Sequence, residues 1–424
     1  MLHQILFSVL ILCTTFRITS ASQFLQLTDL HYDKDYSSQF GSRSNKCHNA
    51  TKPSDLPKKR LGQFGDYACD APKSLIRNAL NAAYEILPNP DFIFWTGDSI
   101  PHIDNYDETS KFPNVRVLPL FGNRDYAPAN AFPDHNCLLY ERIFNLWKRW
   151  IGTANRHTFL KGGYYKYVLG NKVVVLALNT NLYYRLNRAI PRFKNPDDPA
   201  DQFQFMIDTL NDARAKQLFV HVIAHIAPGV FERTPNFKWM VPKYNQRFID
   251  ITIEYADTIK WMIFGHHHTD TFHIVKDPKT HHVAQVYLMA PAVAPWFSSL
   301  EGTTSNNPAF RIYEYDETTQ RLIDAKTYSV NLTKLNRFSY NRSIWELEYS
   351  MAQTYQIKMH PKQFALLADG ITPETMHGVL NKLKRGGDAL KNYIEYNSVR
   401  WNVSIPEGKL LYVSSISLTK IQME

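Results

Sequence analysis

The sequence lacks the features that would assign it to a membrane-spanning or a nucleic-acid-binding class. After its N-terminus it has no apolar run long enough to cross a bilayer, and residues 418–424 are too polar for a lipid-anchor tail. The net charge is +9, yet no block of Lys and Arg resembles a basic arm, so we expect a solvated surface with mild attraction for anionic substrates. A nucleic-acid-binding protein is an alternative that rests on net charge alone, and we expect no nucleic-acid polymer as a partner. We expect a monomer.

Cysteine is also scarce, with four in 424 residues. Cys13 lies in the short apolar run of residues 5–13, which is followed by small residues at 20–22 and resembles a secretory signal. We predict a disulfide between Cys47 and Cys69, which closes a loop rich in Gly, Pro and Lys. Cys137 is then left over, and we expect an inert buried thiol there.

A signal peptide over residues 1–21 predicts a secreted protein, either extracellular or lysosomal. In a secreted chain, each Asn-x-Ser/Thr sequon is a candidate glycan site. The sequence has four of them, at Asn49, Asn331, Asn341 and Asn402.

Continuous apolar runs alternate with segments of helical spacing, which predicts an α/β architecture with strands covered on both faces. We expect a catalytic domain over residues 22–330 and a small C-terminal helical subdomain over 331–424, where Thr372-Pro373 has the form of a helix start. The expected strands cover 24–28, 91–96, 115–121, 164–168, 172–179, 218–224, 259–264, 284–290 and 311–316. The expected helices cover 71–87, 144–150, 201–216 and 242–255.

Five of these strands end in polar residues. In α/β sheets, ligand sites gather at the carboxyl ends of strands, so we expect these side chains to converge. Together they offer oxygen and imidazole ligands without a thiolate, a set that suits two divalent cations, which could clamp a phosphoryl group and ionise a water. We expect one ion to be held by Asp29, His31, Asp98 and His268, and the other by Asp98, Asn123, His225 and His266.

Each of these motifs has a structural explanation when it stands alone. Asp-x-His is common, Gly-Asp and Gly-Asn after a strand are usually turns, and a lone histidine such as His225 is more often a hydrogen-bonded core residue. The metal-site interpretation rests on their order, because five independent strand ends rarely carry such residues by accident.

The same residues resemble a known family. Asp29-x-His31, Gly97-Asp98, Gly122-Asn123, His225 and Gly265-His266-x-His268 match the pattern of calcineurin-like metallophosphoesterases. Gly65–Asp70, Trp95–His102, Asn179–Tyr184, Asn306–Ala309 and Tyr396–Val399 are similar to acid sphingomyelinase-like phosphodiesterases. This resemblance implies a secreted, glycosylated phosphodiesterase with two Zn²⁺ ions and a four-layer α/β/β/α core. It implies small-molecule or lipid-headgroup substrates, either nucleotide-type or phosphocholine-type phosphoesters.

The chain departs from the family pattern at one position that matters for catalysis. Arg124 stands where the family has a histidine that contacts the phosphate and assists leaving-group protonation. A guanidinium can hold a phosphate oxygen but cannot deliver a proton near neutral pH. His102 matches the other catalytic histidine of the family and is our candidate general acid. We therefore expect an enzyme of reduced or altered activity, the alternative being a binding protein that keeps the metal site without turnover.

Overall fold

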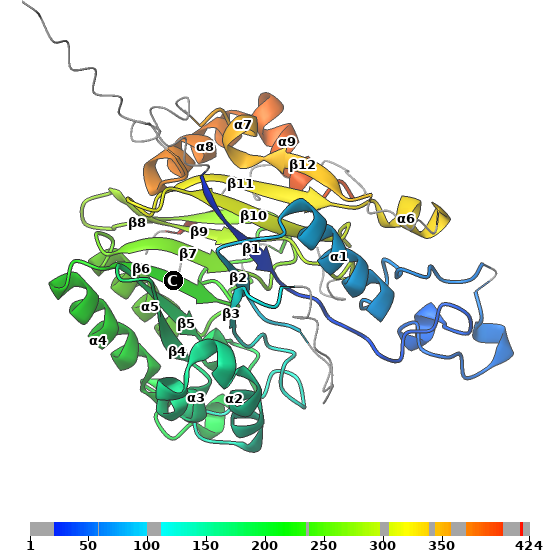
Figure 1. Ribbon diagram of the computed structural model, residues 1–424, viewed down its shortest axis with the longest axis horizontal. Coiled ribbons are helices and arrows are strands. Elements are labelled where there is room, and N and C mark those ends of the chain that lie inside the picture. The colour runs from blue at the N-terminus through cyan, green and yellow to red at the C-terminus, as the bar shows by residue number, and fades with distance from the viewer. Residues whose placement is uncertain are drawn as a thin grey trace, which may run out of the picture.

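The computed structural model describes residues 21–57, 59–99, 112–234, 237–296, 305–338, 344–357, 370–401 and 416–418. Two mixed β-sheets lie face to face, and helices cover their outer sides (Figure 1). This arrangement confirms the predicted four-layer α/β architecture. The expected signal segment lies almost wholly outside the described residues, as do His102, Asn341 and Asn402.

The first sheet has the strand order β12-β11-β10-β1-β2-β3. The three strands that lead toward the predicted ligands, β1, β2 and β3, are parallel to one another. The other three run antiparallel to their neighbours. The strands are β1 (Ser22–Leu27), β2 (Phe92–Trp95), β3 (Arg116–Pro119), β10 (Ala309–Tyr315), β11 (Leu322–Ser329) and β12 (Glu346–Ser350).

The second sheet has the order β13-β8-β9-β7-β6-β5-β4. Its centre is a parallel set of strands. β5 is apolar throughout and β6 is apolar except for His221, and both are almost completely buried, as expected for strands covered on both faces. The strands are β4 (Tyr165–Leu169), β5 (Val173–Leu178), β6 (Phe219–Ala224), β7 (Ile259–Phe264), β8 (Thr271–Lys276), β9 (Val283–Met289) and β13 (Ser417–Leu418).

Aromatic side chains fill part of the space between the two sheets. Phe24 of β1 stacks on Phe92 and Tyr313 of its own sheet, with ring centroids 4.9 and 4.7 Å apart. It also stacks on Trp261 of β7 in the other sheet, at 5.0 Å. Since all four rings are buried, this contact holds the sheets together beneath the strand ends.

The helices pack on the outer sides of the sheets. α1 (Lys73–Ile86) packs against the first sheet, and α4 (Gln202–Ala215) and α5 (Pro242–Glu254) pack against the second. α2 (Leu138–Ile151) and α3 (Arg156–Gly162) pack together beside β3 and β4. None of the helices within the described ranges combines the length and apolar character needed to cross a bilayer.

The chain after residue 330 supplies both helices and strands. Its helices are α6 (Leu332–Phe338), α7 (Met351–Thr354), α8 (Pro373–Arg385) and α9 (Gly387–Asn397). α8 begins with the capping box centred on Thr372, as the sequence indicated. Strands β12 and β13 belong to the first and second sheets, respectively. This part of the chain therefore contributes strands to both sheets in addition to its helices.

The predicted disulfide is present. Cys47 and Cys69 are bonded, with Cα atoms 6.0 Å apart, and they close the loop that follows β1. Cys137 is a free thiol and is half-buried, so it is less enclosed than we expected. The sequons at Asn49 and Asn331 are exposed, as a glycan would require, and glycosylation there stays a prediction.

Candidate metal centre

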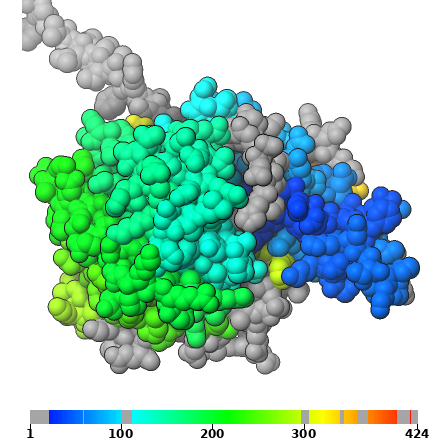
Figure 2. All heavy atoms as spheres, turned by 90° about the horizontal axis from the view of Figure 1, so that it is seen from below, coloured from blue at the N-terminus to red at the C-terminus, as the bar shows by residue number. Residues whose placement is uncertain are grey.

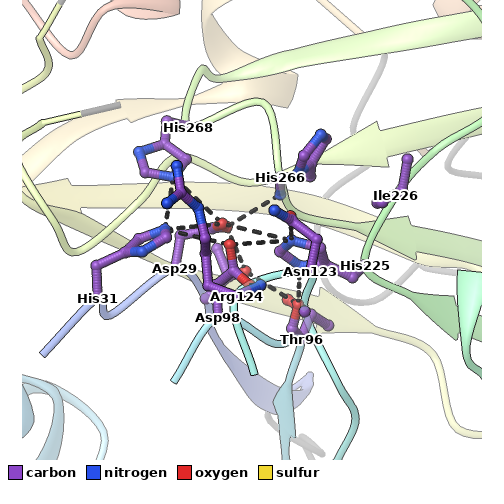
Figure 3. Close-up of polar contacts among 12 residues, drawn as sticks. Asp29, His31, Thr96, Asp98, Asn123, Arg124, His225, Ile226, His266 and His268 are labelled. Carbon is purple, nitrogen blue, oxygen red and sulfur yellow. Dashed lines mark hydrogen bonds and ion pairs between the residues drawn. The ribbon is translucent and has the colours of Figure 1, made fainter. Parts of the chain in front are cut away.

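Seven side chains meet at the carboxyl ends of five strands (Figure 3). The first sheet supplies four of them, after β1, β2 and β3, and the second supplies three, after β6 and β7. Six are buried, and the seventh, His31, is partly accessible. The structure thus brings together all seven residues predicted as ligands: Asp29, His31, Asp98, Asn123, His225, His266 and His268.

The backbone at this site is unusual. Five of the seven residues have positive φ angles between 39° and 69°, a region that L-amino acids rarely adopt. Tertiary contacts hold it there: the amide of Asp29 donates to the Gly97 carbonyl, and the amide of His31 donates to the Asp98 carbonyl, both at 3.0 Å. Such clustered outliers are typical of functional sites, where the surrounding structure imposes the conformation.

Two glycines of the motifs allow the strand ends to approach so closely. A Cβ atom on Gly122 would lie 2.1 Å from Oδ1 of Asp98. A Cβ atom on Gly265 would lie 2.3 Å from Oγ1 of Thr28 and 2.8 Å from Oδ2 of Asp29. A larger residue would therefore push apart the side chains that the site brings together.

One group of candidate ligands consists of Asp29, His31 and His268. Their ligand atoms all lie within 4.8 Å of one another. The Nε2 atoms of the two histidines are 3.0 Å apart, and Oδ1 of Asp29 lies 3.3 Å from Nε2 of His268.

The second group consists of Asp98, His225 and His266, which also fall within 4.8 Å. Asn123 joins it, with Oδ1 3.2 Å from Nε2 of His225. Oδ2 of Asp98 lies 3.4 Å from Nε2 of His225 and 3.3 Å from Nε2 of His31 in the first group. Asp98 therefore sits between the two groups, where a bridging ligand would be needed.

Hydrogen bonds fix the orientation of two of these ligands. Nδ1 of His225 lies 2.7 Å from the Thr96 carbonyl, which can only accept, so this nitrogen carries a proton and Nε2 faces the site. Nδ2 of Asn123 donates to Oδ1 of Asn130 at 2.9 Å, so its amide oxygen faces the site.

The residues present fit a metal centre. Oδ2 of Asp29 accepts hydrogen bonds from Thr28 Oγ1 and the His266 amide, whereas Oδ1 is buried and accepts none within the described chain. That oxygen lies 3.3 to 3.9 Å from three imidazole nitrogens, those of His268, His31 and His225. A buried carboxylate oxygen needs a partner, and a divalent cation among nitrogen and oxygen donors would supply it.

The electrostatics agree with this interpretation. Burial by itself raises the pKa of Asp29, but His268 and His225 outweigh it and hold that pKa well below its usual value. Burial by itself lowers the pKa of His225, but Asp98 and Asp29 outweigh it and raise that pKa to about 9. The two buried carboxylates therefore favour a positive charge beside them. A bound cation would supply that charge, and its ligands must be deprotonated at the atoms that bind it.

Sequence reasoning missed two groups that support the ligands. Oδ2 of the buried Asp125 accepts the amides of Asp98 and Gly122, at 3.0 and 2.7 Å, and so fixes two ligand loops together. Glu232 lies behind the histidine loop, and its Oε2 atom is 3.0 Å from Nδ1 of His267. Asp125 stands next to a motif already recognised, but no spacing in the sequence links Glu232 to the histidines.

Glu232 also ties the histidine loop to the C-terminal part of the chain. Its Oε1 atom accepts from Thr269 Oγ1 at 2.5 Å and from Asn397 Nδ2 at 2.9 Å. The backbone carbonyl of Asn397 accepts the Asp270 amide at 3.1 Å. The motif that contains Asn397 therefore has a structural role here, because it braces the loop that presents His266 and His268.

Arg124, the departure from the family pattern, is exposed. Its backbone amide donates to Oδ1 of Asp98 at 2.7 Å, which places the residue directly beside the candidate bridging ligand. Figure 3 shows the side chain reaching from its loop toward His31 and His268. The guanidinium is therefore on the accessible side of the site, where a substrate would enter.

Comparison with known proteins agrees with this geometry. Residues 22–270 match the family model of calcineurin-like phosphoesterases, and residues 282–378 match that of the acid sphingomyelin phosphodiesterase C-terminal region. The chain is 33% identical over 408 residues to acid sphingomyelinase-like phosphodiesterase 3b of Homo sapiens, covering 90% of this chain and 84% of that protein. It is 35% identical over 379 residues to cyclic GMP-AMP phosphodiesterase SMPDL3A of Homo sapiens, covering 84% and 78%.

A relative of lower identity matches over a similar share of the chain. Sphingomyelinase phosphodiesterase C of Dictyostelium discoideum is 30% identical over 372 residues, covering 83% of this chain and 82% of that protein. These matches extend over both sheets and the strand ends that carry the candidate ligands. The chain therefore belongs to the acid sphingomyelinase-like phosphodiesterases of the calcineurin-like phosphoesterase family and is a metal-dependent phosphodiesterase.

Proposed function

We propose that this phosphodiesterase holds two Zn²⁺ ions and hydrolyses small phosphoesters. One ion is held by Asp29, His31, Asp98 and His268, and the other by Asp98, Asn123, His225 and His266. The observation that carries the proposal is the position of Asp98, whose Oδ2 atom lies between Nε2 of His31 and Nε2 of His225, at 3.3 and 3.4 Å. The dimetal centre used by this family needs a shared ligand at that point.

Two cations bound in this way supply an ionised water and neutralise charge on the phosphoryl oxygens. The chain's own residues orient the reaction. Asn123 presents its amide oxygen because Asn130 fixes its amide nitrogen. Arg124 holds a non-bridging phosphate oxygen, because its planar fork of donors matches phosphate. It cannot protonate the leaving group, so that role falls to His102, and we expect slower turnover than a histidine at position 124 would give.

The names of the relatives support a proposal for the substrate class. Their names describe a cyclic GMP-AMP phosphodiesterase and sphingomyelinase-like enzymes. We propose for this chain a nucleotide-type or phosphocholine-type phosphoester, met outside the cytosol by a secreted, glycosylated monomer, with the extracellular space or the lysosome as its location. The Cys47–Cys69 disulfide supports an oxidising compartment.

The test combines metal analysis with a substrate panel. Purified full-length protein is analysed for zinc and assayed on bis-p-nitrophenyl phosphate, a cyclic dinucleotide and sphingomyelin, with and without added zinc. Asp98→Asn, which keeps the shape of the side chain, is the control. We expect two zinc ions per chain and turnover well above the control on at least one substrate. Turnover no higher than that of Asp98→Asn on all three would contradict the proposal.

A second candidate function is a silent binder that keeps the metals without the chemistry. The exposed Arg124 in place of a histidine is the observation that favours it. Two zinc ions and tight phosphoester binding without hydrolysis would support this second function. Absence of bound metal would eliminate both.

A further inference from the structure

A surface that contains none of the candidate ligands concentrates positive charge. Residues 138–172, which form α2, α3, β4 and their connections, contain seven Lys or Arg and one Glu, a net charge of +6. The whole chain of 424 residues has a net charge of +9. The basic residues are spaced along the segment and form no long consecutive block: Arg142, Lys148, Arg149, Arg156, Lys161, Lys166 and Lys172.

The same surface exposes large apolar side chains. Leu138 and Leu146 of α2 are 61% and 56% exposed, and Val168 of β4 is 54% exposed. Leu138, Arg142, Leu146 and Arg149 follow one another at spacings of four, four and three residues, so they line one face of the helix. Tyr140, Phe144 and Ile151 of the opposite face are buried. α2 therefore presents a stripe of alternating apolar and basic side chains to solvent.

Figure 2 shows this segment, in teal, as a continuous face of the molecule. We call the surface of α2, α3 and β4 the α2–α3 face. Next to α3 a cavity of about 460 Å³ is lined by Arg156 and Lys194, which form no ion pair within the described chain. Its two carboxylates are already engaged, Asp134 by the Asn195 amide and His135, and Asp201 by Lys161 and Asn195. The cavity is thus open to an anionic group.

We propose that the α2–α3 face docks on a membrane surface rich in anionic lipid. The basic residues complement the negative headgroups, and Leu138 and Leu146 enter the boundary between headgroups and acyl chains. The cavity beside Arg156 accepts a lipid phosphate. A polyanion such as RNA would use the charge but would gain nothing from the leucines, which is why we favour a lipid surface.

Docking there would bring the membrane close to the metal centre. Phe121 precedes the ligand Asn123 by two residues, and its ring packs on Trp147 of α2 and Phe159 of α3, with centroids 5.0 and 5.6 Å apart. The α2–α3 face and the Asn123 loop therefore share one aromatic core. This inference does not depend on the proposed metals or substrate, because it concerns where the protein binds.

Vesicle co-sedimentation of the full-length protein tests the proposal. The probes are vesicles of phosphatidylcholine alone and of phosphatidylcholine mixed with phosphatidylserine, at low and high salt. We expect binding only to the mixed vesicles, with a loss at high salt because screening weakens the attraction. Arg142→Glu with Arg149→Glu should weaken binding by about 25-fold or more, since each basic residue near an anionic surface contributes roughly fivefold. Leu138→Ser with Leu146→Ser should weaken it by about threefold or more.

The matched control is Lys384→Glu with Arg385→Glu at the end of α8, which makes the same change in net charge on two exposed residues. Figure 1 places α8 on the far side of the sheets from α2. We expect this control to bind like the wild type, and thermal melting shows that each variant is folded. Equal loss in the control, or equal binding to neutral vesicles, would overturn the proposal. So would leucine variants that bind normally together with an RNA oligonucleotide bound as tightly as the vesicles.

Discussion

The two sheets contribute different chemistry to the same site. The first sheet supplies both carboxylates, the amide and one imidazole, whereas the second supplies three imidazoles and no carboxylate. Each of the two ligand groups contains residues from both sheets. The site therefore exists only where the sheets are packed against each other, and neither half could bind the proposed ions alone.

The ligand loops of the two sheets also differ in their burial and in the contacts that support them. The histidine loop of the second sheet is buried from His266 to Asp270 and braced by Glu232 and Asn397. The loop that follows β3 in the first sheet carries the exposed Arg124. We infer that the second sheet is the fixed scaffold and that the first sheet presents the side chain that meets the substrate.

The largest effect should come from the residue that joins the two halves. Asp98→Asn keeps the size of the side chain but removes the charge shared by both ligand groups. Changing a residue that only orients a metal ligand already costs 10- to 100-fold, so we expect a loss of more than about a hundredfold in kcat/KM and the loss of at least one bound ion. If the variant keeps both ions and half of the activity, the two ligand groups are independent of each other.

A substitution of Glu232, which lies behind the histidine loop of the second sheet, should act on the metal centre through the histidines alone. Glu232→Gln removes the charge that faces His267, and we expect metal affinity to fall about 10- to 100-fold while the protein stays folded. The matched control is Asp324→Asn, another buried carboxylate, which accepts from Ser350 and from the Ala352 amide in the first sheet. It should lower stability by about 1–3 kcal/mol without changing the metal content. Equal metal loss in both variants would mean that Glu232 has no special role.

The role of Arg124 in meeting the substrate is tested by restoring the histidine that the family has at position 124. Arg124→His returns a group that can transfer a proton, and we expect kcat on bis-p-nitrophenyl phosphate to rise about tenfold. Arg124→Gln, which removes the charge without adding a proton donor, is the control and should lower kcat/KM. An unchanged or lower rate for Arg124→His would contradict our account of this position.

The smallest effect on the site should come from the disulfide. Replacing both Cys47 and Cys69 with Ser opens a loop between residues 22 positions apart. The free energy of unfolding should fall by about 3 kcal/mol, while kcat changes less than about twofold, because neither cysteine contributes a ligand. Cys137→Ser is the control and should change neither quantity. A large loss of turnover in the double variant would show that this loop shapes the site.

The candidate metal ligands could be predicted from the sequence more completely than the residues that hold those ligands in place. Strands such as β7 (Ile259–Phe264) are largely apolar, with Lys260 as the exception there, and each is followed by a candidate ligand. β8 and β11 were not predicted because polar residues interrupt their apolar runs. α2 begins at Leu138, earlier than predicted, since Cys137 at its N-cap provides no side-chain cap. Glu232 meets His267 across 35 residues, a contact that only the folded chain creates.

The most direct test of the shared site is a crystal structure with anomalous scattering measured at the zinc absorption edge. We expect two peaks roughly 3.5–4 Å apart, with the carboxylate of Asp98 touching both. A single peak, or peaks bound by residues of one sheet only, would contradict the claim that the centre is built from both sheets.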